Sequence, residues 1–238
     1  MTTSVLAYGL LIIGSAAFIL GFAFGRLDAE RAHRSPTWTR MLNSAALVLA
    51  ALALWRGVAS GTPLVAYAGL VCGGMALSFL GDILMARLIR LPLHPAPGMV
   101  AFGLAHVLYI IGYAQAGQAL GLRNPVAWGA AVAVAVLLGI VVWRLVAYNP
   151  REEAVLLYGA LGYTVLLAAM TGAAAALALQ DGRFTLLAVG ALLFLISDAI
   201  LANRLFHHNN WLLVGDLVWA IYIAGQSLIV FTLPLLQP

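Results

Sequence analysis

Long apolar runs dominate this sequence and constrain its fold more than any other feature. Eight of them follow one another, each near the length of ~20 residues with which an α-helix crosses ~30 Å of hydrocarbon. They cover residues 4–25, 41–58, 63–86, 98–117, 125–147, 154–179, 184–203 and 211–235. A backbone in lipid has to satisfy its own hydrogen bonds, so these runs predict transmembrane helices. The first run lacks the basic start of a cleaved signal sequence, and we interpret it as a retained helix.

The composition points to an integral membrane protein and excludes other classes. Of the 238 residues, 64% are hydrophobic and 8% are charged, which no ordinary soluble domain matches. The net charge is +4, but the arginines are spread over short loops and form no basic face for a nucleic acid. A single cysteine, Cys72, excludes an internal disulfide. We therefore predict one all-α domain over residues 1–238, a bundle of eight transmembrane helices in the cell membrane.

The arginines predict how the bundle is oriented. Nine lie in or beside the loops that follow the odd-numbered helices, and three lie on the other side. The positive-inside rule places the first set in the cytoplasm and both chain termini outside. The first set is Arg26, Arg31, Arg34, Arg40, Arg87, Arg90, Arg144, Arg151 and Arg204. The second set is Arg56, Arg123 and Arg183.

Two similar stretches each carry an aspartate within an apolar run. "SFLGDILMA" at 78–86 holds Asp82, and "FLISDAILA" at 194–202 holds Asp198. Gly74 and Gly190 each precede the aspartate by eight residues. The stretches fall on the third and seventh helices, which run in the same direction, and this suggests a parallel four-plus-four internal repeat. Each aspartate is expected roughly one turn from the cytoplasmic end of its helix, ~6 Å deep at 1.5 Å per residue.

These aspartates have a structural and a functional interpretation. A carboxylate near a helix end can reach the membrane surface or pair with a nearby arginine such as Arg87 or Arg204. However, helix C-termini favour cations, so both aspartates lie at the unfavourable end of the helix dipole. Ionisable residues inside a membrane usually mark a functional site, and we favour that interpretation.

Other polar residues are expected at the same level of the bundle. His106, Tyr109 and Tyr113 follow a helical spacing that puts them on one face. Tyr222 and Gln226 share an arc of the last helix with Asp216, which, near the helix start, is readily explained as a cap or dipole partner. Further polar positions are Arg40 and Asn43 on the second helix and Tyr158 and Tyr163 on the sixth. We expect these side chains to line a cavity in the cytoplasmic leaflet, with the first and fifth helices as an outer scaffold.

At this point the chain resembles the YhhN-like lysoplasmalogenase family of multi-pass enzymes. The resemblance covers most of the chain and rests on five pieces in order. They are "SFLGDILMA" (78–86), "FGLAHVLYIIGY" (102–113), "YTVLLAAM" (163–170), "GALLFLISDAILA" (190–202) and "YIAGQSLIV" (222–230). The family typically has a lysine where this sequence has Arg40, a change that preserves a phosphate contact but not proton transfer.

The resemblance implies hydrolysis of the vinyl ether bond of lysoplasmalogen, a lysophospholipid of the bilayer. The hypothesis is that Asp82 and Asp198 form the catalytic acid–base pair, with the individual roles open. His106, Tyr109, Tyr163, Tyr222, Gln226 and Asn43 would bind and position substrate and water. Arg40, with Arg87 or Arg204, would hold the phosphate. The sequence shows no metal-ligand spacing and no phosphate loop, so no metal or other cofactor is predicted.

Two other functions stay open at this stage. Intramembrane Asp, His and Tyr residues also form proton relays, so the chain could be a transporter for protons or a small solute. The clustering of polar residues in one leaflet argues against this, because a carrier needs access from both sides. A lipid-binding protein without turnover is the remaining alternative.

Overall fold

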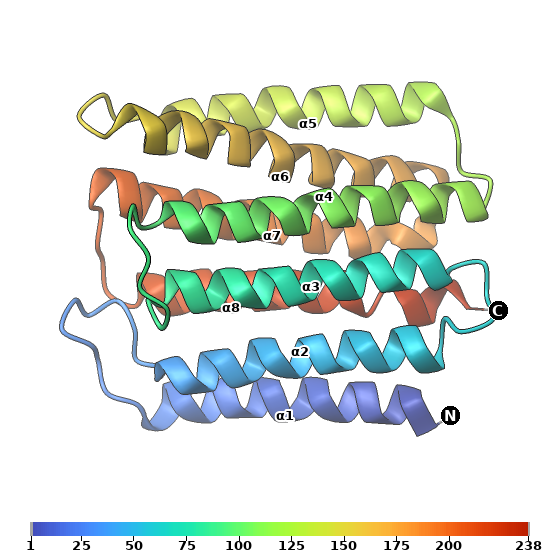
Figure 1. The fold of residues 1–238 in the computed structure, drawn as a ribbon, viewed down its shortest axis with the longest axis horizontal. Coiled ribbons are helices and arrows are strands. Elements are labelled where there is room, and N and C mark those ends of the chain that lie inside the picture. The colour runs from blue at the N-terminus through green and yellow to red at the C-terminus, as the bar shows by residue number, and fades with distance from the viewer. Residues whose placement is uncertain (1, 238) are drawn as a thin grey trace.

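The computed structural model describes residues 2–237, and within this range it has eight long α-helices and no β-strand (Figure 1). All eight are long and apolar enough to cross a membrane, which confirms the predicted fold class. Their bounds are α1 Thr2–Phe24, α2 Thr37–Gly57, α3 Val65–Met85, α4 Ala96–Ala119, α5 Pro125–Val146, α6 Ala154–Gln180, α7 Thr185–His207 and α8 Val214–Val230. Short 3-10 helices at Gly182–Phe184 and Leu233–Leu236 precede α7 and follow α8.

Six of these helices form a closed ring. In the order α2, α3, α4, α6, α7 and α8, each helix contacts the next, α8 contacts α2, and α3 also contacts α8. α1 packs on α2 and α5 packs on α6, so the two lie at opposite edges of the bundle (Figure 1). This agrees with the outer position expected for the first and fifth helices. The internal repeat stays a prediction. The positions of α1 and α5 are compatible with it, because each is the first helix of its half and packs on the second.

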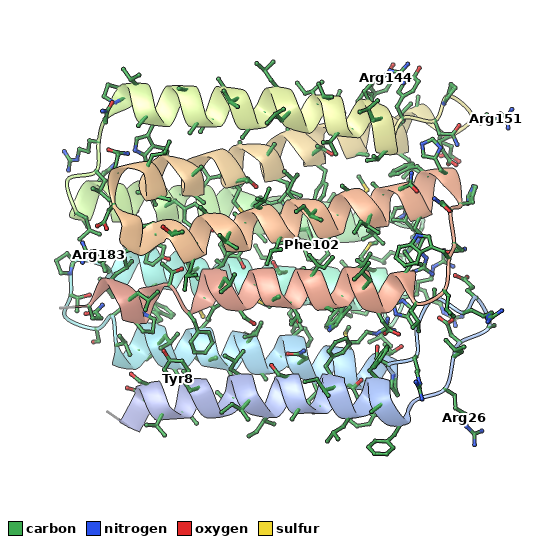
Figure 2. All side chains as sticks on the ribbon, turned by 180° about the vertical axis from the view of Figure 1, so that it is seen from behind. Tyr8, Arg26, Phe102, Arg144, Arg151 and Arg183 are labelled. Carbon is green, nitrogen blue, oxygen red and sulfur yellow. The ribbon has the colours of Figure 1, made fainter. Side chains whose placement is uncertain are left out.

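The two ends of the bundle differ in charge. Both chain termini lie at one end (Figure 1). Arg26, Arg144 and Arg151 lie at the opposite end, whereas Arg183 lies on the side of the termini (Figure 2). This is the separation that the distribution of arginines among the loops predicts. The assignment of the arginine-rich end to the cytoplasm remains a prediction.

The end of α7 differs from the sequence prediction. The helix continues to His207, so nine residues rather than one turn follow Asp198. The polar stretch stays helical because Phe206, near its end, is buried in a cluster with Trp143 and Ala147 of the α5 end. Asp82, by contrast, lies in the last turn of α3 as expected.

The glycines that precede the two aspartates allow close packing. A Cβ atom on Gly190 of α7 would lie 2.7 Å from the carbonyl oxygen of Gly225 on α8. A Cβ atom on Gly74 of α3 would lie 2.5 Å from the ring of Tyr109 on α4. The shared glycine of the two stretches therefore lets a neighbouring element approach the helix directly.

The contact between α7 and α8 predicts a loss of stability for Gly190→Ala. The new methyl group meets backbone that cannot move cheaply, and overpacking of this kind costs about 1–3 kcal/mol. Gly129→Ala on α5 is the matched control, because its Cβ would have no neighbour within 4 Å. Alanine there gains up to about 1 kcal/mol of helix propensity. Thermal unfolding of both variants in detergent checks this, and equal shifts would contradict it.

Candidate active site

Asp82 is held by two hydroxyl groups from other helices. Its side chain is 5% exposed. The Ser44 hydroxyl on α2 donates to its Oδ2 at 2.5 Å, and the Tyr222 hydroxyl on α8 donates to the same oxygen at 3.1 Å. Three helices of the ring thus converge on one carboxylate.

A buried hydrogen-bond chain continues from Tyr222. The amide Nε2 of Gln226, one turn further along α8, donates to the Tyr222 hydroxyl at 3.5 Å. Its Oε1 accepts a hydrogen bond from Tyr109 of α4 at 2.9 Å. Gln226 and Tyr109 are fully buried. The chain from Asp82 to Tyr109 therefore joins α3, α8 and α4, and it brings together four residues predicted for the site.

Asp198 forms a second cluster with two predicted residues. Its Oδ2 accepts a short hydrogen bond from the Tyr163 hydroxyl of α6, and Ser197 Oγ lies 3.4 Å from its Oδ1. His106 Nε2 on α4 is 3.2 Å from the same Tyr163 hydroxyl. Because Tyr163 donates to the carboxylate, its oxygen accepts from His106, and this assigns the imidazole proton to Nε2.

Aromatic rings join the two clusters. The Phe194 ring centroid is 5.1 Å from that of Tyr222 and 5.0 Å from that of His106. Phe102 packs edge-on against both Phe194 and Tyr222. Phe194 therefore touches a member of each cluster. The aspartates occupy neighbouring clusters, and each carboxylate has its own tyrosine donor.

No arginine neutralises either aspartate within residues 2–237. Arg204 instead pairs with Glu30 at 2.7 Å and bonds Asn210. Arg87 lies 3.2 Å from His94. The structural interpretation of the aspartates as partners of these arginines is wrong, and Arg204 is committed to a surface ion pair.

Arg40 lies one turn along α2 from Ser44, toward the arginine-rich end. Its Nη1 contacts the His33 ring, and its Nη2 donates to Thr37 Oγ1 at 3.1 Å. The guanidinium carbon is 6.0 Å from the ring centroid of Trp219. Its Nε is buried and has no hydrogen-bond partner in the described chain. Arg40 is thus a half-buried cation held near the Asp82 cluster.

Asn43 lies outside the hydrogen-bonded network. It is buried, and its side chain faces α1, where its Oδ1 would be 3.0 Å from a Cβ atom on Gly14. The next residue, Ser44, faces Asp82 instead. Ser44 is not among the predicted site residues, although its spacing of four from Arg40 puts both on one helix face.

Asp216 anchors the loop between α1 and α2. Its carboxylate accepts from the backbone N–H groups of Arg34 at 2.5 Å and Ser35 at 3.2 Å, and from the Ser35 hydroxyl. His33 Nδ1 is 3.6 Å away. Asp216 is therefore a structural residue, but it does not cap its own helix as the sequence suggested, because its carboxylate is taken up by the α1–α2 loop.

Asp216→Ala should reduce stability by about 1–3 kcal/mol, since it leaves buried backbone donors without an acceptor. Thermal unfolding in detergent, together with limited proteolysis of the 25–36 loop, measures this loss. An unchanged melting temperature and an equally resistant loop would contradict the anchoring role.

Buried hydroxyls also extend toward the other end of the bundle. Tyr113 stacks on Tyr109 with ring centroids 6.2 Å apart, and Tyr67 packs against Tyr113 at 6.4 Å. Both are fully buried, and neither hydroxyl has a partner among residues 2–237. Tyr67 precedes Asp82 by fifteen residues on α3, a rise of about 22 Å. The expectation that polar groups occupy only one leaflet is therefore wrong.

Comparison with known proteins places the chain in a family. The model of the YhhN family matches residues 37–233, which span α2 to α8 and include both aspartate clusters. No curated protein and no solved structure shows significant similarity to the chain. Because the match covers far more than half of the sequence, this chain belongs to the YhhN family.

Proposed function

We propose that this protein hydrolyses the vinyl ether bond of lysoplasmalogen, releasing a fatty aldehyde and glycerophosphoethanolamine or glycerophosphocholine. The observation that carries the proposal is the pair of aspartates inside the ring, each bonded by a tyrosine hydroxyl on another helix. Membership of the YhhN family supports a lysoplasmalogenase-like activity.

Vinyl ether hydrolysis requires one general acid and one carboxylate. The proton is added to the alkene carbon that does not carry the ether oxygen. This step leaves a positively charged oxocarbenium ion. A water molecule adds to this ion and gives up a proton, and the resulting hemiacetal separates into aldehyde and glycerol hydroxyl. One aspartic acid supplies the first proton and the other carboxylate stabilises the cation and orients water, with the two roles unassigned between Asp82 and Asp198.

The surrounding residues position the reactants in this proposal. Tyr222 and Tyr163 orient the carboxylates, and His106, Tyr109 and Gln226 position substrate and water. Asn43 takes no part in this proposal, because it faces α1. Arg40, held near the Asp82 cluster on the α2 side, binds the polar end of the substrate, because a guanidinium can form two parallel hydrogen bonds. The alkenyl chain enters sideways from the cytoplasmic leaflet of the cell membrane.

The test compares two substrates that differ only in the reacting bond. Purified protein is incubated with lysoplasmalogen and with its saturated ether analogue, and aldehyde is assayed. The proposal expects aldehyde from the first alone, because the saturated ether has no alkene carbon to protonate. An absence of aldehyde from both would overturn it.

Transport of protons or a small solute is the second candidate, and one observation favours it. The unpartnered hydroxyls of Tyr113 and Tyr67 continue the polar groups beyond the Asp82 cluster. Reconstitution in liposomes separates the candidates, since solute or proton flux without aldehyde release supports transport. Binding of the saturated analogue with neither flux nor turnover supports a lipid-binding protein.

A further inference from the structure

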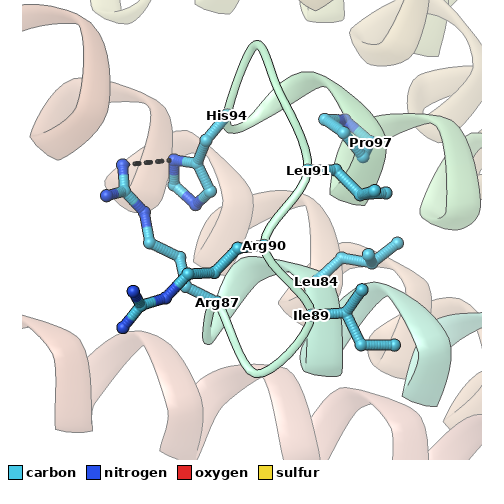
Figure 3. Close-up of a pocket in the computed structure, with 7 residues that line it drawn as sticks. All are labelled: Leu84, Arg87, Ile89, Arg90, Leu91, His94 and Pro97. Carbon is cyan, nitrogen blue, oxygen red and sulfur yellow. Dashed lines mark hydrogen bonds between the residues drawn. The ribbon is translucent and has the colours of Figure 1, made fainter.

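A pocket of about 490 Å³ lies between the end of α3 and the start of α4. Figure 3 shows that its wall has two parts. Arg87, Arg90 and His94 lie on one side, and Leu84, Ile89 and Leu91 lie on the other. The pocket is thus cationic on one side and apolar on the other.

His94 holds Arg87 in place without contributing charge. Its Nε2 is 3.3 Å from the carbonyl oxygen of Met85, which can only accept, so Nε2 carries a proton. Its Nδ1 then accepts from Arg87 Nη2 at 3.2 Å (Figure 3). Burial, with a smaller effect from the Arg87 charge, lowers the pKa of His94 and favours this neutral form.

The positive charge of the pocket has no acidic partner. Neither Arg87 nor Arg90 forms an ion pair within residues 2–237, whereas Arg183 and Arg204 both do. The pocket wall contains no Asp or Glu. Two arginines therefore line a space whose wall offers no carboxylate.

The backbone conformation also indicates that the arginine side chain at position 87 has a function. Leu88 N–H bonds the Ile83 carbonyl and Arg87 N–H bonds the Leu84 carbonyl, which is the Schellman ending of a helix. Arg87 has a φ of +55°, at the position that glycine usually takes because a side chain there is strained. Such strain in a pocket wall points to a function for the side chain.

The same loop exposes large aliphatic side chains. Leu88, Ile89, Leu91 and Leu93 are each about half exposed. They alternate with Arg87 and Arg90 at the arginine-rich end of the bundle. Aliphatic side chains that enter the acyl region, beside arginines that meet phosphates, are typical of segments at a membrane interface.

We propose that this pocket binds the phosphodiester of the lysophospholipid substrate through Arg87 and Arg90. The inference rests on the proposed function, and the connection is geometric. Asp82 lies three residues before the end of α3 at Met85, a helical rise of about 4.5 Å, and Arg87 follows two residues beyond that end. In the substrate, only the glycerol unit and its ester and ether oxygens separate the phosphorus from the vinyl carbons. Phosphate in the pocket therefore places the vinyl ether beside the last turn of α3.

The experiment uses R87Q, R90Q and the double variant, with R151Q as the matched control. Arg151 is an exposed arginine at the same end of the bundle, in the α5–α6 loop. For the double variant we expect a KM raised at least tenfold with kcat within about twofold, since charge-assisted contacts to phosphate are lost. R151Q should match the wild type. An unchanged KM in the double variant would overturn the assignment.

Binding to the saturated ether analogue separates failure of the pocket from failure of the proposed function. If the wild type releases no aldehyde, weaker analogue binding by the double variant alone still supports the pocket, and equal binding overturns it. Inorganic phosphate and glycerophosphoethanolamine serve as competitors. Competition by both, at similar concentrations, assigns a general phosphate site; competition by the glycerol ester alone assigns the headgroup. If neither competitor displaces the analogue, and the double variant binds the analogue as tightly as the wild type, the proposal is wrong.

Discussion

Asp82→Asn and Asp198→Asn are each expected to abolish aldehyde release while leaving a folded, membrane-inserted protein. Asparagine keeps the size of the side chain but can neither supply a proton to carbon nor carry the negative charge that stabilises the cation. Loss of a general acid or base typically lowers the rate by about 10²–10⁴-fold. Aldehyde release per folded molecule measures the effect, with size-exclusion chromatography and thermal unfolding in detergent as checks of folding.

Asp181→Asn is the matched control for these variants. Asp181 lies in the α6–α7 turn and is paired only with Arg183 in the described chain. Arg183 lies at the end of the bundle away from the arginine-rich loops (Figure 2). The activity of Asp181→Asn should equal that of the wild type. Full activity in both Asp82→Asn and Asp198→Asn would refute the catalytic pair, whereas full activity in one would reduce the site to a single carboxylate.

Tyr163→Phe and Tyr222→Phe carry the second largest expected effect, a loss of about tenfold to hundredfold in kcat. Each change removes the hydroxyl that orients one aspartate, and a charge-assisted hydrogen bond is worth about 1.5–3 kcal/mol. KM should change by less than about threefold, since the phosphate contacts stay intact.

Tyr158→Phe provides the comparison within α6. Tyr158 is 62% exposed on the same helix as Tyr163, so the identical substitution removes no contact of the site. A kcat loss of the same size in Tyr158→Phe, or a change in KM alone in the other two variants, would show that the tyrosines do not act through the aspartates.

The helices could be predicted from the sequence because hydropathy and length alone determine a membrane span. The aspartates and their tyrosines could be predicted as well, since charge is costly in lipid and helical spacing groups residues on one face. Which face of α2 points toward Asp82 could not be predicted in this way. Successive residues on a helix differ by about 100° in direction, so Asn43 faces α1 while its neighbour Ser44 bonds Asp82.

Contacts between distant segments could not be predicted for a different reason. The carboxylate of Asp216 accepts hydrogen bonds from Arg34 and Ser35, which lie more than 180 residues earlier in the sequence. Arg204 pairs with Glu30 across a similar separation in sequence. Which residues pair in this way depends on how the six-helix ring closes. No local pattern in the sequence predicts that closure. The Arg87 and Arg90 pocket depends in the same way on how the α3–α4 loop folds back toward Met85.

Hydrolysis of lysoplasmalogen in deuterated water tests the central claim most directly. If an aspartic acid protonates the alkene carbon and water then adds, the aldehyde, reduced in place to its alcohol, carries one deuterium on the carbon next to the former carbonyl. Mass spectrometry of the wild-type product should show this single deuterium, and the Asp82→Asn and Asp198→Asn proteins should yield no labelled product. Wild-type protein that releases no aldehyde, or aldehyde without deuterium at that carbon, would contradict the account.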